Sequence, residues 1–594
     1  MYGARFDDAE TGQSFELKGA LRELVAEEVG DVRSVLRSVS EEAASGNWVA
    51  GYVAYEAAPA FDDALVVQSG LEGPLAWFGV FSERQEIEPP SLESSAPGSF
   101  SVSRWNPEWD AEQYAKAFGE VRRHIEVGES YQVNLTFHLR AAVSGPADLI
   151  YADLLLAQKP SYAAHLWHGD THVLSVSPEQ FFSVRDGRLA TRPMKGTARR
   201  GRWAEEDAAI RDALSESSKD RAENLMIVDL LRNDLGRVAE FGSVNVDELL
   251  TLEKYGTVWQ MTSQISADLR QEVELVDVFG ALFPCGSVTG APKGSSMKII
   301  SDLELAPRGV YCGAIGFVPP GDGINGSSFN VAIRTVEIDE SEGVALYGVG
   351  GGITWASEAD DEYAEAMTKA RVLSERPMPL ELIETIRWDD GWLLLDEHLA
   401  RLSKSATYWD MPCEVDSLRP MLAEIETELS GPTRLRIVAY GEGKVSFSFD
   451  TAPERFALGP GPAEEPVRLR IDVDPLDPRN PRLFHKTTDR HHFDVRRKRH
   501  ADVDDVLCVN NRGLVTESTI SNVAFLINGA WFTPPMTDGL LPGVLRGKLI
   551  DDGVLTERSI PVADALAAEA VALLNSVRGW EPAVLEPIPE MSVP

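Results

Sequence analysis

Cysteine is scarce in this chain, and its few cysteines are scattered. The 594 residues include only four, at Cys285, Cys312, Cys413 and Cys508, and no two have CxxC spacing. This pattern excludes a disulfide scaffold and a zinc ribbon, and it favours a reducing cytoplasm. We therefore expect each cysteine to be a small core residue.

Positive charge is also in short supply. There are 56 Lys and Arg residues against 94 Asp and Glu, which gives a formal net charge of −38. A nucleic-acid-binding protein needs a basic surface, so the balance argues against nucleic acid as a partner. An anionic substrate would have to be met by local cations and backbone amides, against the overall field.

Long hydrophobic runs are missing as well. No apolar stretch approaches the roughly 20 residues that a membrane-spanning helix needs. The first residues, MYGARFDDAETGQSF, lack a basic segment followed by an apolar one, so we expect no signal peptide. These features predict a cytoplasmic protein with no membrane association.

The chain is too long for one hydrophobic core. In the sequence SERPMPLELIET, Pro377 and Pro379 follow a helical pattern, and a strand pattern begins at Leu382. We predict a first domain over 1–375, a linker over 376–380 and a second domain over 381–594.

Four stretches of the first domain carry chemistry. ESYQVNLTFHL (129–139) alternates as a strand does, and KDRAENLMIVDLLRNDLG (219–236) has the pattern of an amphipathic helix. Between them lie SPEQFF (177–182) and TRPMKGTARRG (191–201). The fourth is GVGGGITWASEADDEYAEAMTKA (348–370).

The glycines at 350–352 lack Cβ atoms, so their N–H groups can approach a carboxylate closely. In the helix predicted after them, Glu362, Glu365 and Lys369 share one face. Together with Glu223 from the other predicted helix, the carboxylates of Glu362 and Glu365 could hold Mg²⁺. Substrate oxygens and waters would complete its coordination shell. Taken singly, each acidic residue is more often part of a solvated helix face.

In order and spacing, these stretches resemble the chorismate-utilising enzymes. FPCGSVTGAPK (283–293), RGVYCGAIG (308–316) and FNVAIRT (329–335) match the same family, and the resemblance covers roughly residues 100–375. It implies an α+β fold in which large antiparallel sheets form a sandwich under outer helices.

Two positions distinguish the branches of this family. Isochorismate-forming relatives carry a lysine base where this chain has Gln132, and a neutral amide cannot deprotonate water. Anthranilate synthases usually have a small residue where this chain has Lys195. That lysine resembles the one in aminodeoxychorismate synthase, which attacks C2 of chorismate and expels the C4 hydroxyl before ammonia adds at C4. The resemblance makes Glu179 the general acid and base.

The resemblance also supplies the remaining site residues. It assigns the two substrate carboxylates to Arg334, Lys369, Tyr311, Thr289, Gly196, Gly350 and Gly352. It places Mg²⁺ on Glu223 and Glu365, with Glu362 as a further candidate. Many relatives have His where this chain has Gln260, which cannot titrate and so cannot act as acid or base. No Gly-x-Cys-x-Gly elbow is present, so we expect a separate glutamine amidotransferase to supply ammonia.

The second domain has its own motifs. These are ELIETIRWDDGWLLLDEHLARLSKSA (381–406), RLFHKTTDRHHFD (482–494), LCVNNRGLVTESTISNVAFLINGAWFTPP (507–535) and LLPGVLRGKLI (540–550). They resemble the fold-type IV pyridoxal phosphate enzymes, which have two subdomains. The resemblance makes Lys486 the cofactor-linked lysine and Glu517 the partner of the pyridine nitrogen. The phosphate would contact Arg401 and the backbone amides around Ser518, Thr519, Val544 and Leu545, where relatives usually have Thr instead of Leu545.

The fold-type IV motifs do not separate lyases from transaminases, so the first domain decides. If it makes 4-amino-4-deoxychorismate, the second domain would release pyruvate and leave 4-aminobenzoate for folate synthesis. The resemblance also implies that the chain forms a homodimer through the second domain. One alternative is an anthranilate or 2-amino-2-deoxyisochorismate synthase fused to a pyridoxal phosphate aminotransferase. Another is a degenerate scaffold that only recruits the amidotransferase, against which the intact lysines and carboxylates weigh. The basic run DVRRKRH (494–500) is interpreted as a solvated helix face.

Overall fold

The computed structural model describes residues 2–9, 11–90, 100–256, 258–321, 323–373, 381–441, 443–454, 456–461 and 465–586. It divides into two compact units. The first comprises Met1–Arg199 and Arg211–Pro377, and the second comprises Arg200–Ile210 and Met378–Pro594. The predicted linker over 376–380 lies outside the described residues. The second unit thus includes a short segment from the middle of the predicted first domain.

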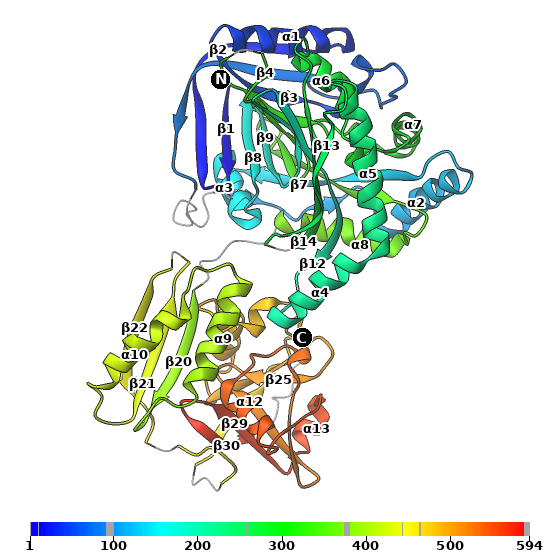
Figure 1. Cartoon of the computed structure of the whole chain (residues 1–594). Coiled ribbons are helices and arrows are strands. Elements are labelled where there is room, and N and C mark those ends of the chain that lie inside the picture. Colours follow the sequence, from blue (N-terminus) through cyan, green and yellow to red (C-terminus); the bar gives the residue numbers. More distant parts are fainter. Residues whose placement is uncertain are drawn as a thin grey trace. The chain divides into compact units, whose positions relative to one another are not determined.

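Antiparallel strands form the centre of the first unit (Figure 1). Neighbouring strands pair in one continuous order: β13 (Asn245–Lys254), β14 (Val258–Asp268), β11 (Arg188–Arg192), β10 (Gln180–Arg185), β17 (Ser328–Val331), β16 (Ala314–Val318), β3 (Trp48–Val53), β4 (Ala76–Glu86), β2 (Gln13–Ala26), β1 (Tyr2–Asp8), β8 (Tyr162–His168), β9 (Thr171–Ser177), β18 (Thr335–Asp339), β19 (Val344–Ile353) and β7 (Gln132–Ser144). At one end, β12 (Met194–Arg199) also pairs with β14. At the other, β7 also pairs with β5 (Ser101–Val102), β6 (Asn106–Pro107) and β15 (Gly290–Ala291).

Helices cover the outside of these strands (Figure 1), which confirms the predicted sandwich. They are α1 (Val29–Ala44), α2 (Ala111–Glu126), α3 (Ala147–Gln158), α5 (Ser218–Gly236), α6 (Leu275–Leu282), α7 (Lys293–Leu303) and α8 (Ala359–Lys369), with 3₁₀ turns at Tyr55–Ala60, Gly286–Val288 and Ala370–Leu373. The predicted amphipathic helix is α5, which buries Ile227, Leu231 and Leu235 at helical spacing and starts at the capping residue Ser217. Its buried side anchors the helix that carries Glu223.

The second unit has two sheets, as the two-subdomain resemblance implies. An antiparallel sheet of β20 (Leu382–Trp388), β21 (Thr433–Ala439) and β22 (Val445–Thr451) packs with α9 (Leu395–Tyr408) and α10 (Leu418–Glu426). A mixed sheet has the order β25 (Val515–Ser518), β24 (Asp505–Val509), β23 (Val467–Ile471), β30 (Gly579–Leu585), β29 (Ala570–Asn575), β26 (Asn522–Ile527), β27 (Ala530–Thr533) and β28 (Thr556–Glu557). The remaining elements are α11 (His491–Arg499), α12 (Val544–Asp551), α13 (Val562–Leu566) and 3₁₀ turns at Val415–Ser417, Pro481–Phe484 and Met536–Asp538.

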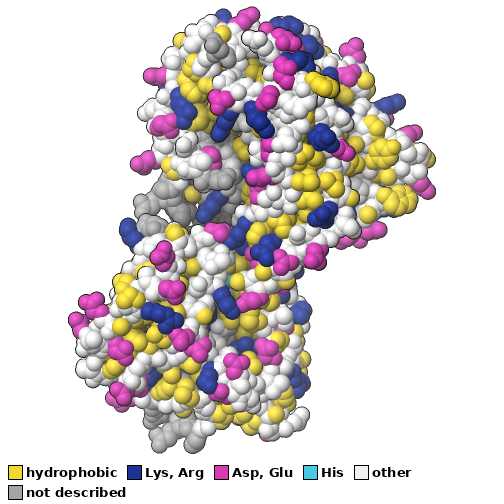
Figure 2. Space-filling model, viewed as in Figure 1, with side chains coloured by type: hydrophobic (Ala, Val, Ile, Leu, Met, Phe, Trp, Pro, Cys, Tyr) yellow, Lys and Arg dark blue, Asp and Glu magenta, His cyan; other side chains and the backbone are white. Residues whose placement is uncertain are grey.

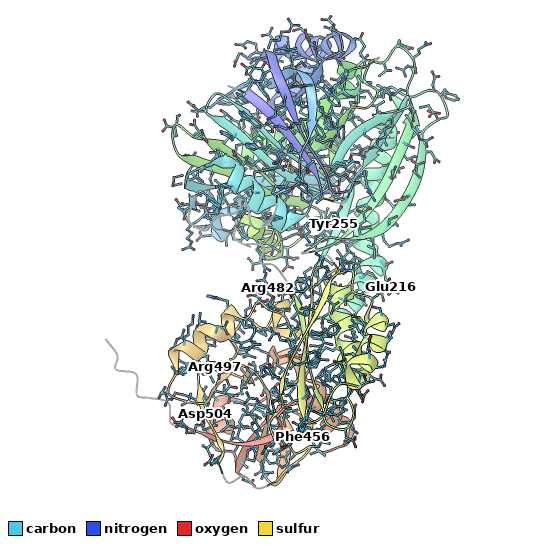
Figure 3. The ribbon with its side chains drawn as sticks, turned by 90° about the vertical axis from the view of Figure 1, so that its left-hand side faces the viewer. Glu216, Tyr255, Phe456, Arg482, Arg497 and Asp504 are labelled. Atoms are coloured by element: carbon cyan, nitrogen blue, oxygen red, sulfur yellow. The ribbon has the colours of Figure 1, made fainter. Side chains whose placement is uncertain are left out.

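One helix, α4 (Ala204–Glu216), is shared between the units along the chain. Its first residues, up to Ile210, belong to the second unit, and from Arg211 it belongs to the first. Glu216, at its end, is labelled in Figure 3. The short part of the second unit, Arg200–Ile210, therefore lies in the sequence between β12, which carries Lys195, and α5, which carries Glu223.

Three of the four cysteines are buried, as expected, while Cys413 is partly exposed. Among the described residues, no helix is long and apolar enough to cross a membrane. The face drawn in Figure 2 intersperses acidic and basic side chains.

The basic run over 494–500 lies largely on α11, where Arg497 is near Asp504 (Figure 3). Arg499 pairs with Asp472 at 2.8 Å. The expectation of a fully solvated face is wrong for Arg496, which is buried. It donates to the carbonyl of Asp474 at 2.7 Å, because burial requires its guanidinium to find acceptors inside the protein.

Candidate active sites

In the first unit, Lys195 lies where the two ends of the strand order meet. It sits on β12, while Gln132 and Gly352 come from β7 and β19 at the other end. A Cβ atom on Gly352 would lie 2.3 Å from Gln132 Nε2 and 3.0 Å from Lys195 Nζ. The absence of a side chain at position 352 therefore gives the lysine and the amide access to the same space.

The neighbouring glycines serve Lys369 in the same way. A Cβ on Gly351 would lie 3.1 Å from Glu362 Oε2 and 3.7 Å from Lys369 Nζ. Lys369 donates to the carbonyl of Gly350 at 2.8 Å and pairs with Glu365 at 2.9 Å. The glycine strand thus lies beside two lysines, of which Lys369 offers local positive charge to an anionic ligand in this acidic protein.

The environment of Lys195 favours a neutral amine. Burial lowers the pKa of Lys195, and the positive charge of Lys369 lowers it further. Glu223 and Glu179 oppose this shift. A neutral amine is the nucleophilic form of lysine, so the shift suits a covalent role.

A residue that the sequence reasoning missed holds the main chain of Lys195. Asn224, next to Glu223 on α5, is buried and donates to the carbonyls of Lys195 at 3.3 Å and Met261 at 3.2 Å. Ser263 completes the network by donating to Asn224 Oδ1 at 2.7 Å. The sequence does contain a signal for Asn224, because this amide residue occupies a position on the buried, otherwise apolar side of α5.

Glu179 is suited to carry a proton. Its side chain is 3% exposed, and burial raises its pKa to about 7, against the opposing effects of Ser287 and Lys195. Within the described residues, Glu179 Oε1 and both polar side-chain atoms of Gln132 are buried without a hydrogen-bond partner. Buried polar atoms are normally paired, so these atoms fit a polar ligand.

Two of the three predicted metal ligands, Glu223 and Glu362, are connected only indirectly, through hydroxyl groups. Thr354 Oγ1 donates to Glu223 Oε1 at 3.4 Å and lies 3.4 Å from the hydroxyl of Ser357, which interacts with Glu362. Burial raises the pKa of Glu223 and of Glu362, whereas Lys369 lowers the pKa of Glu365.

Lys219 lies near enough to act electrostatically on all three carboxylates. Among the described residues, no group of three or more His, Cys, Asp or Glu side chains could by itself hold a metal. Burial disfavours the charge of Glu223 and Glu362, and these two with Glu365 fit a hard cation whose shell substrate and water would complete.

The other predicted substrate residues surround the glycine strand and its neighbours. The Tyr311 ring packs against Gly348, where a Cβ would come within 2.2 Å of it. Thr289 is buried beside β7, and its carbonyl accepts from Asn134 at 2.8 Å. Arg334 has a positive φ of 52° and donates to Gln158 Oε1 at 3.1 Å.

Two further predicted positions lie on β12 and β14. Gly196 has a φ of +93°, a conformation that favours glycine, and follows Lys195 directly. Gln260 accepts from Thr197 Oγ1 at 3.0 Å. It therefore holds the part of β12 after Lys195 by a neutral hydrogen bond.

In the second unit, all seven predicted cofactor residues line one cavity. They are Lys486, Glu517, Arg401, Ser518, Thr519, Val544 and Leu545. These residues are contributed by α9, by β25 and the residue after it, by α12, and by the segment between the 3₁₀ turn Pro481–Phe484 and α11. The sequence motifs of the second domain thus assemble at a single place.

Lys486 follows the 3₁₀ turn Pro481–Phe484, and its carbonyl accepts from the N–H of Ile383 at 2.8 Å. Burial lowers its pKa to about 8, and the positive charge of Arg401 contributes. A considerable fraction of the amine is therefore neutral near physiological pH, as carbonyl chemistry requires.

Arg401 is held by two residues that the sequence reasoning missed. Its Nε and Nη2 donate to the two oxygens of Glu384, each at 2.8 Å. Glu384 is buried and also contacts His398 Nδ1 at 2.6 Å. This network orients the guanidinium at the cavity, where it suits a phosphate.

The backbone amides divide into two groups. The N–H of Ser518 donates to Ser521 O at 2.8 Å, and that of Thr519 donates to Val506 O at 3.1 Å. The N–H groups of Ser518 and Thr519 are thus already hydrogen-bonded, one within its own turn and one to β24, and the phosphate role of this turn stays a prediction. Val544 and Leu545 begin α12, and the first N–H groups of a helix lack acceptors within it, which suits an anion.

The side chain of Leu545 packs in a hydrophobic core cluster. Its side chain is 1% exposed. Position 545 thus has a packing role in this chain, where relatives usually have a hydroxyl.

Glu517 also lines this cavity. It accepts from the N–H of Leu541 at 3.0 Å and from Asn522 Nδ2 at 3.3 Å. Burial raises its pKa to about 8. A protonated pyridine nitrogen would stabilise the charge that burial disfavours, so the carboxyl fits that partner.

Comparisons with known proteins identify the families of the two parts of the chain. The chorismate binding enzyme family matches residues 6–375, and the amino-transferase class IV family matches residues 381–584. The chain is 43% identical over 265 residues to aminodeoxychorismate synthase of Streptomyces griseus, covering 44% of this chain and 36% of that protein. It is 38% identical over 319 residues to aminodeoxychorismate synthase component 1 of Escherichia coli K12, covering 53% and 69%.

A solved structure shares the fold of the first unit. Anthranilate synthase component I from Streptococcus pneumoniae TIGR4 aligns with a TM-score of 0.53 and 26% identity over 62% of this chain and 92% of that chain. The aligned stretches span from about a third to about two thirds of the length of the two curated relatives above. Residues 6–375 place the chain in the family of chorismate binding enzymes, and an amino-transferase class IV domain follows over residues 381–584.

Proposed function

We propose that the first unit replaces the C4 hydroxyl of chorismate with an amine, giving 4-amino-4-deoxychorismate. The observation that carries this proposal is Lys195, whose amine shares the space in front of Gly352 with Gln132. Its lowered pKa and the protonatable Glu179 beside it support a lysine nucleophile and a carboxyl acid. The names of the two curated relatives support the same reaction.

The proposed steps follow from these two groups. Neutral Lys195 attacks C2, the ring double bonds shift, and the C4–O bond breaks while Glu179 gives its proton to the departing hydroxyl. Ammonia then adds at C4, the double bonds shift back, and the C2–N bond to Lys195 breaks. Glu179 takes a proton from the incoming nitrogen, which restores the acid.

Glu223 and Glu365, with Glu362 beside them, would hold Mg²⁺, which would neutralise charge on the substrate. The ammonia would come from a separate glutamine amidotransferase. The words "component 1" in the name of the Escherichia coli relative support such a partner.

The second unit would take this amine and release pyruvate, leaving 4-aminobenzoate for folate synthesis. Arg401 and the amides at the start of α12 would bind the phosphate of pyridoxal phosphate, and Glu517 would face its ring nitrogen. When bound, that cofactor withdraws electrons from the carbon next to the substrate nitrogen. Lys486 would remove the proton at C4, and loss of enolpyruvate would leave an aromatic ring. We further propose a homodimer formed through this unit.

The alternative is anthranilate synthesis, which the solved neighbour's name suggests for its own chain. Lys195 favours C4 amination instead, because anthranilate synthases usually have a small residue at that position. A transaminase in the second unit is the corresponding alternative there.

Incubation with chorismate, Mg²⁺, an ammonium salt and pyridoxal phosphate tests both proposals, with products separated by chromatography. We expect 4-aminobenzoate and pyruvate in equal amounts. Anthranilate as the main product would overturn the first proposal. Rapid turnover of a branched-chain amino acid with 2-oxoglutarate, without 4-aminobenzoate, would overturn the second.

A further inference from the structure

The segment Arg200–Ile210 belongs by sequence to the chorismate-binding region but packs in the second unit. It follows Lys195 by only five residues and precedes Glu223 on α5. Within the second unit, it contacts the chain immediately before Lys486.

The first group of contacts holds Phe484. The ring of Trp203 lies 5.0 Å from that of Phe484, centroid to centroid, and joins a core cluster with Leu476, Leu483, Phe493 and Cys508. The guanidinium of Arg202 covers both rings, at 4.6 Å and 5.3 Å. Its Nη1 also donates to the carbonyl of Pro478 at 3.2 Å. Phe484 is thereby packed from outside its own stretch of chain.

The second group of contacts holds His485, the neighbour of Lys486. His485 Nε2 lies 3.2 Å from the carbonyl oxygen of Arg202, so this nitrogen carries the hydrogen. Nδ1 then accepts from the Ser405 hydroxyl at 2.9 Å. The ring stacks on Tyr408 with centroids 4.4 Å apart, and Tyr408 donates to the carbonyl of Gly201 at 2.6 Å.

The segment is itself a tightly built turn. Arg200 and Asp207 form a buried ion pair at 2.8 Å, and the N–H of Gly201 donates to Asp207 Oδ1 at 2.7 Å. A Cβ on Gly201 would lie 2.2 Å from the backbone nitrogen of Asp207, so the turn closes only with glycine there. A turn fixed in this way can hold its neighbours in one position.

We propose that Arg200–Ile210 is a positioning element for Lys486. The segment fixes Phe484 and His485 on one side, and Ile383 fixes the carbonyl of Lys486 on the other. The amine of Lys486 is thereby aimed into the cavity by residues that belong to the other half of the sequence. This inference rests on the proposed function, because it assigns the segment to the pyridoxal phosphate site.

The test uses the full chain and four variants. Trp203→Ala removes the packing on Phe484, Trp203→Phe keeps an aromatic ring, and Tyr408→Phe removes only the hydroxyl that donates to Gly201. The control Lys404→Ala breaks the ion pair of Lys404 with Glu205, which touches the same segment but is exposed on both sides. The dissociation constant of pyridoxal phosphate and the pH midpoint of its visible absorbance are measured, and circular dichroism verifies folding.

We expect Trp203→Ala to weaken binding about tenfold or more and to shift the pH midpoint. Tyr408→Phe should produce a smaller change in the same direction, Trp203→Phe should recover most of the binding, and Lys404→Ala should match the wild type. If Trp203→Ala folds and both it and Tyr408→Phe match the wild type, the positioning role is overturned while the proposed function stands. If Trp203→Ala does not fold, the result for Tyr408→Phe decides. If the wild type itself binds no pyridoxal phosphate, the proposed function of the second unit fails, and the positioning role with it.

Discussion

The two lysine sites reach a similar state by different means. Burial lowers the pKa of both lysines, but the neighbours differ. Lys195 lies among carboxylates that oppose the shift, with Lys369 as the cation that favours it. Lys486 has arginines around it, with Glu384 as the opposing carboxylate.

This difference indicates what each lysine meets. Carboxylates near Lys195 suit the proposed Mg²⁺ site and the proposed proton-transferring acid, and they oppose the lowering of the pKa of this amine. Arginines near Lys486 suit a phosphate-bearing cofactor, and Arg401 adds to the effect of burial in lowering the pKa of the amine. The comparison predicts that the two sites fail in different ways when altered.

The largest expected effect is that of Lys195→Ala. Loss of the nucleophile should lower ammonia-dependent chorismate consumption by at least about 10³-fold. Binding of pyridoxal phosphate in the other unit should be unchanged. A rate near that of the wild type would contradict the covalent role. Lys219→Ala is the matched control, since it removes a nearby lysine whose proposed role is only electrostatic.

The next largest effect is expected for Glu179→Gln, which should lower ammonia-dependent chorismate consumption by about 10²- to 10⁴-fold. Because the pKa of Glu179 is about 7, its acid form decreases as the pH rises through 7. The rate of hydroxyl loss, measured as kcat/KM for chorismate, should therefore fall above pH 7 in the wild type. Glu179→Gln should not show this fall in kcat/KM above pH 7. If the fall persists in the variant, another group carries the proton.

The carboxylates of the first site should give a smaller effect that depends on the metal. Glu223→Gln and Glu365→Gln should raise the Mg²⁺ concentration needed for half-maximal rate by about 10- to 100-fold. Glu216→Gln, at the end of α4, provides a control outside the group. An unchanged Mg²⁺ requirement in both variants would show that the metal is held elsewhere.

The pH dependence of stability should separate the sites further. The pKa of Glu517 is raised to about 8 from 4.5, so without cofactor the folded state holds this proton more tightly than the unfolded state. Its contribution is present below pH 4.5 and is lost as the pH rises through 8. Glu517→Gln should therefore make the cofactor-free protein more stable than the wild type at pH 9. Thermal unfolding at pH 4 and 9 measures this, and an equal difference at both values would contradict it.

The smallest expected effect concerns Leu545. Because its side chain fills a core cluster, Leu545→Thr should cost roughly 2–4 kcal/mol of stability, as truncations of buried leucine do. Leu545→Met should cost less than about 1.5 kcal/mol. Denaturant unfolding of the cofactor-free protein measures both. If the threonine variant is as stable as the wild type, position 545 has no packing role.

The sequence predicted the residues that line the second site better than the residues that hold them in place. Lys486, Glu517 and Arg401 were recognised from local motifs, and they line one cavity. Glu384 was missed, because only the packing of α9 on β20 brings it to Arg401, and His398 on α9 was missed with it because its contact is with Glu384. The amides of Ser518 and Thr519 were assigned to phosphate, but the first already donates within its own turn, to Ser521, and the second to Val506.

The first site shows the same limit. The helical pattern of α5 and the strand pattern of β7 were evident, so Glu223 and Gln132 could be placed on their elements, whereas the glycines were not assigned to a strand. The role of Asn224 depends on a contact between α5 and β12, which periodicity does not reveal. The inclusion of Arg200–Ile210 in the second unit could not be predicted either, because its contacts are with residues about 200 or more positions later.

The most direct test of the division of labour between the two lysines is the product formed by Lys486→Ala. The variant is incubated with chorismate, Mg²⁺, ¹⁵N-ammonium and pyridoxal phosphate, and products are identified by mass spectrometry. We expect ¹⁵N-labelled 4-amino-4-deoxychorismate to accumulate without 4-aminobenzoate or pyruvate. Labelled anthranilate, or 4-aminobenzoate at the wild-type rate, would contradict it.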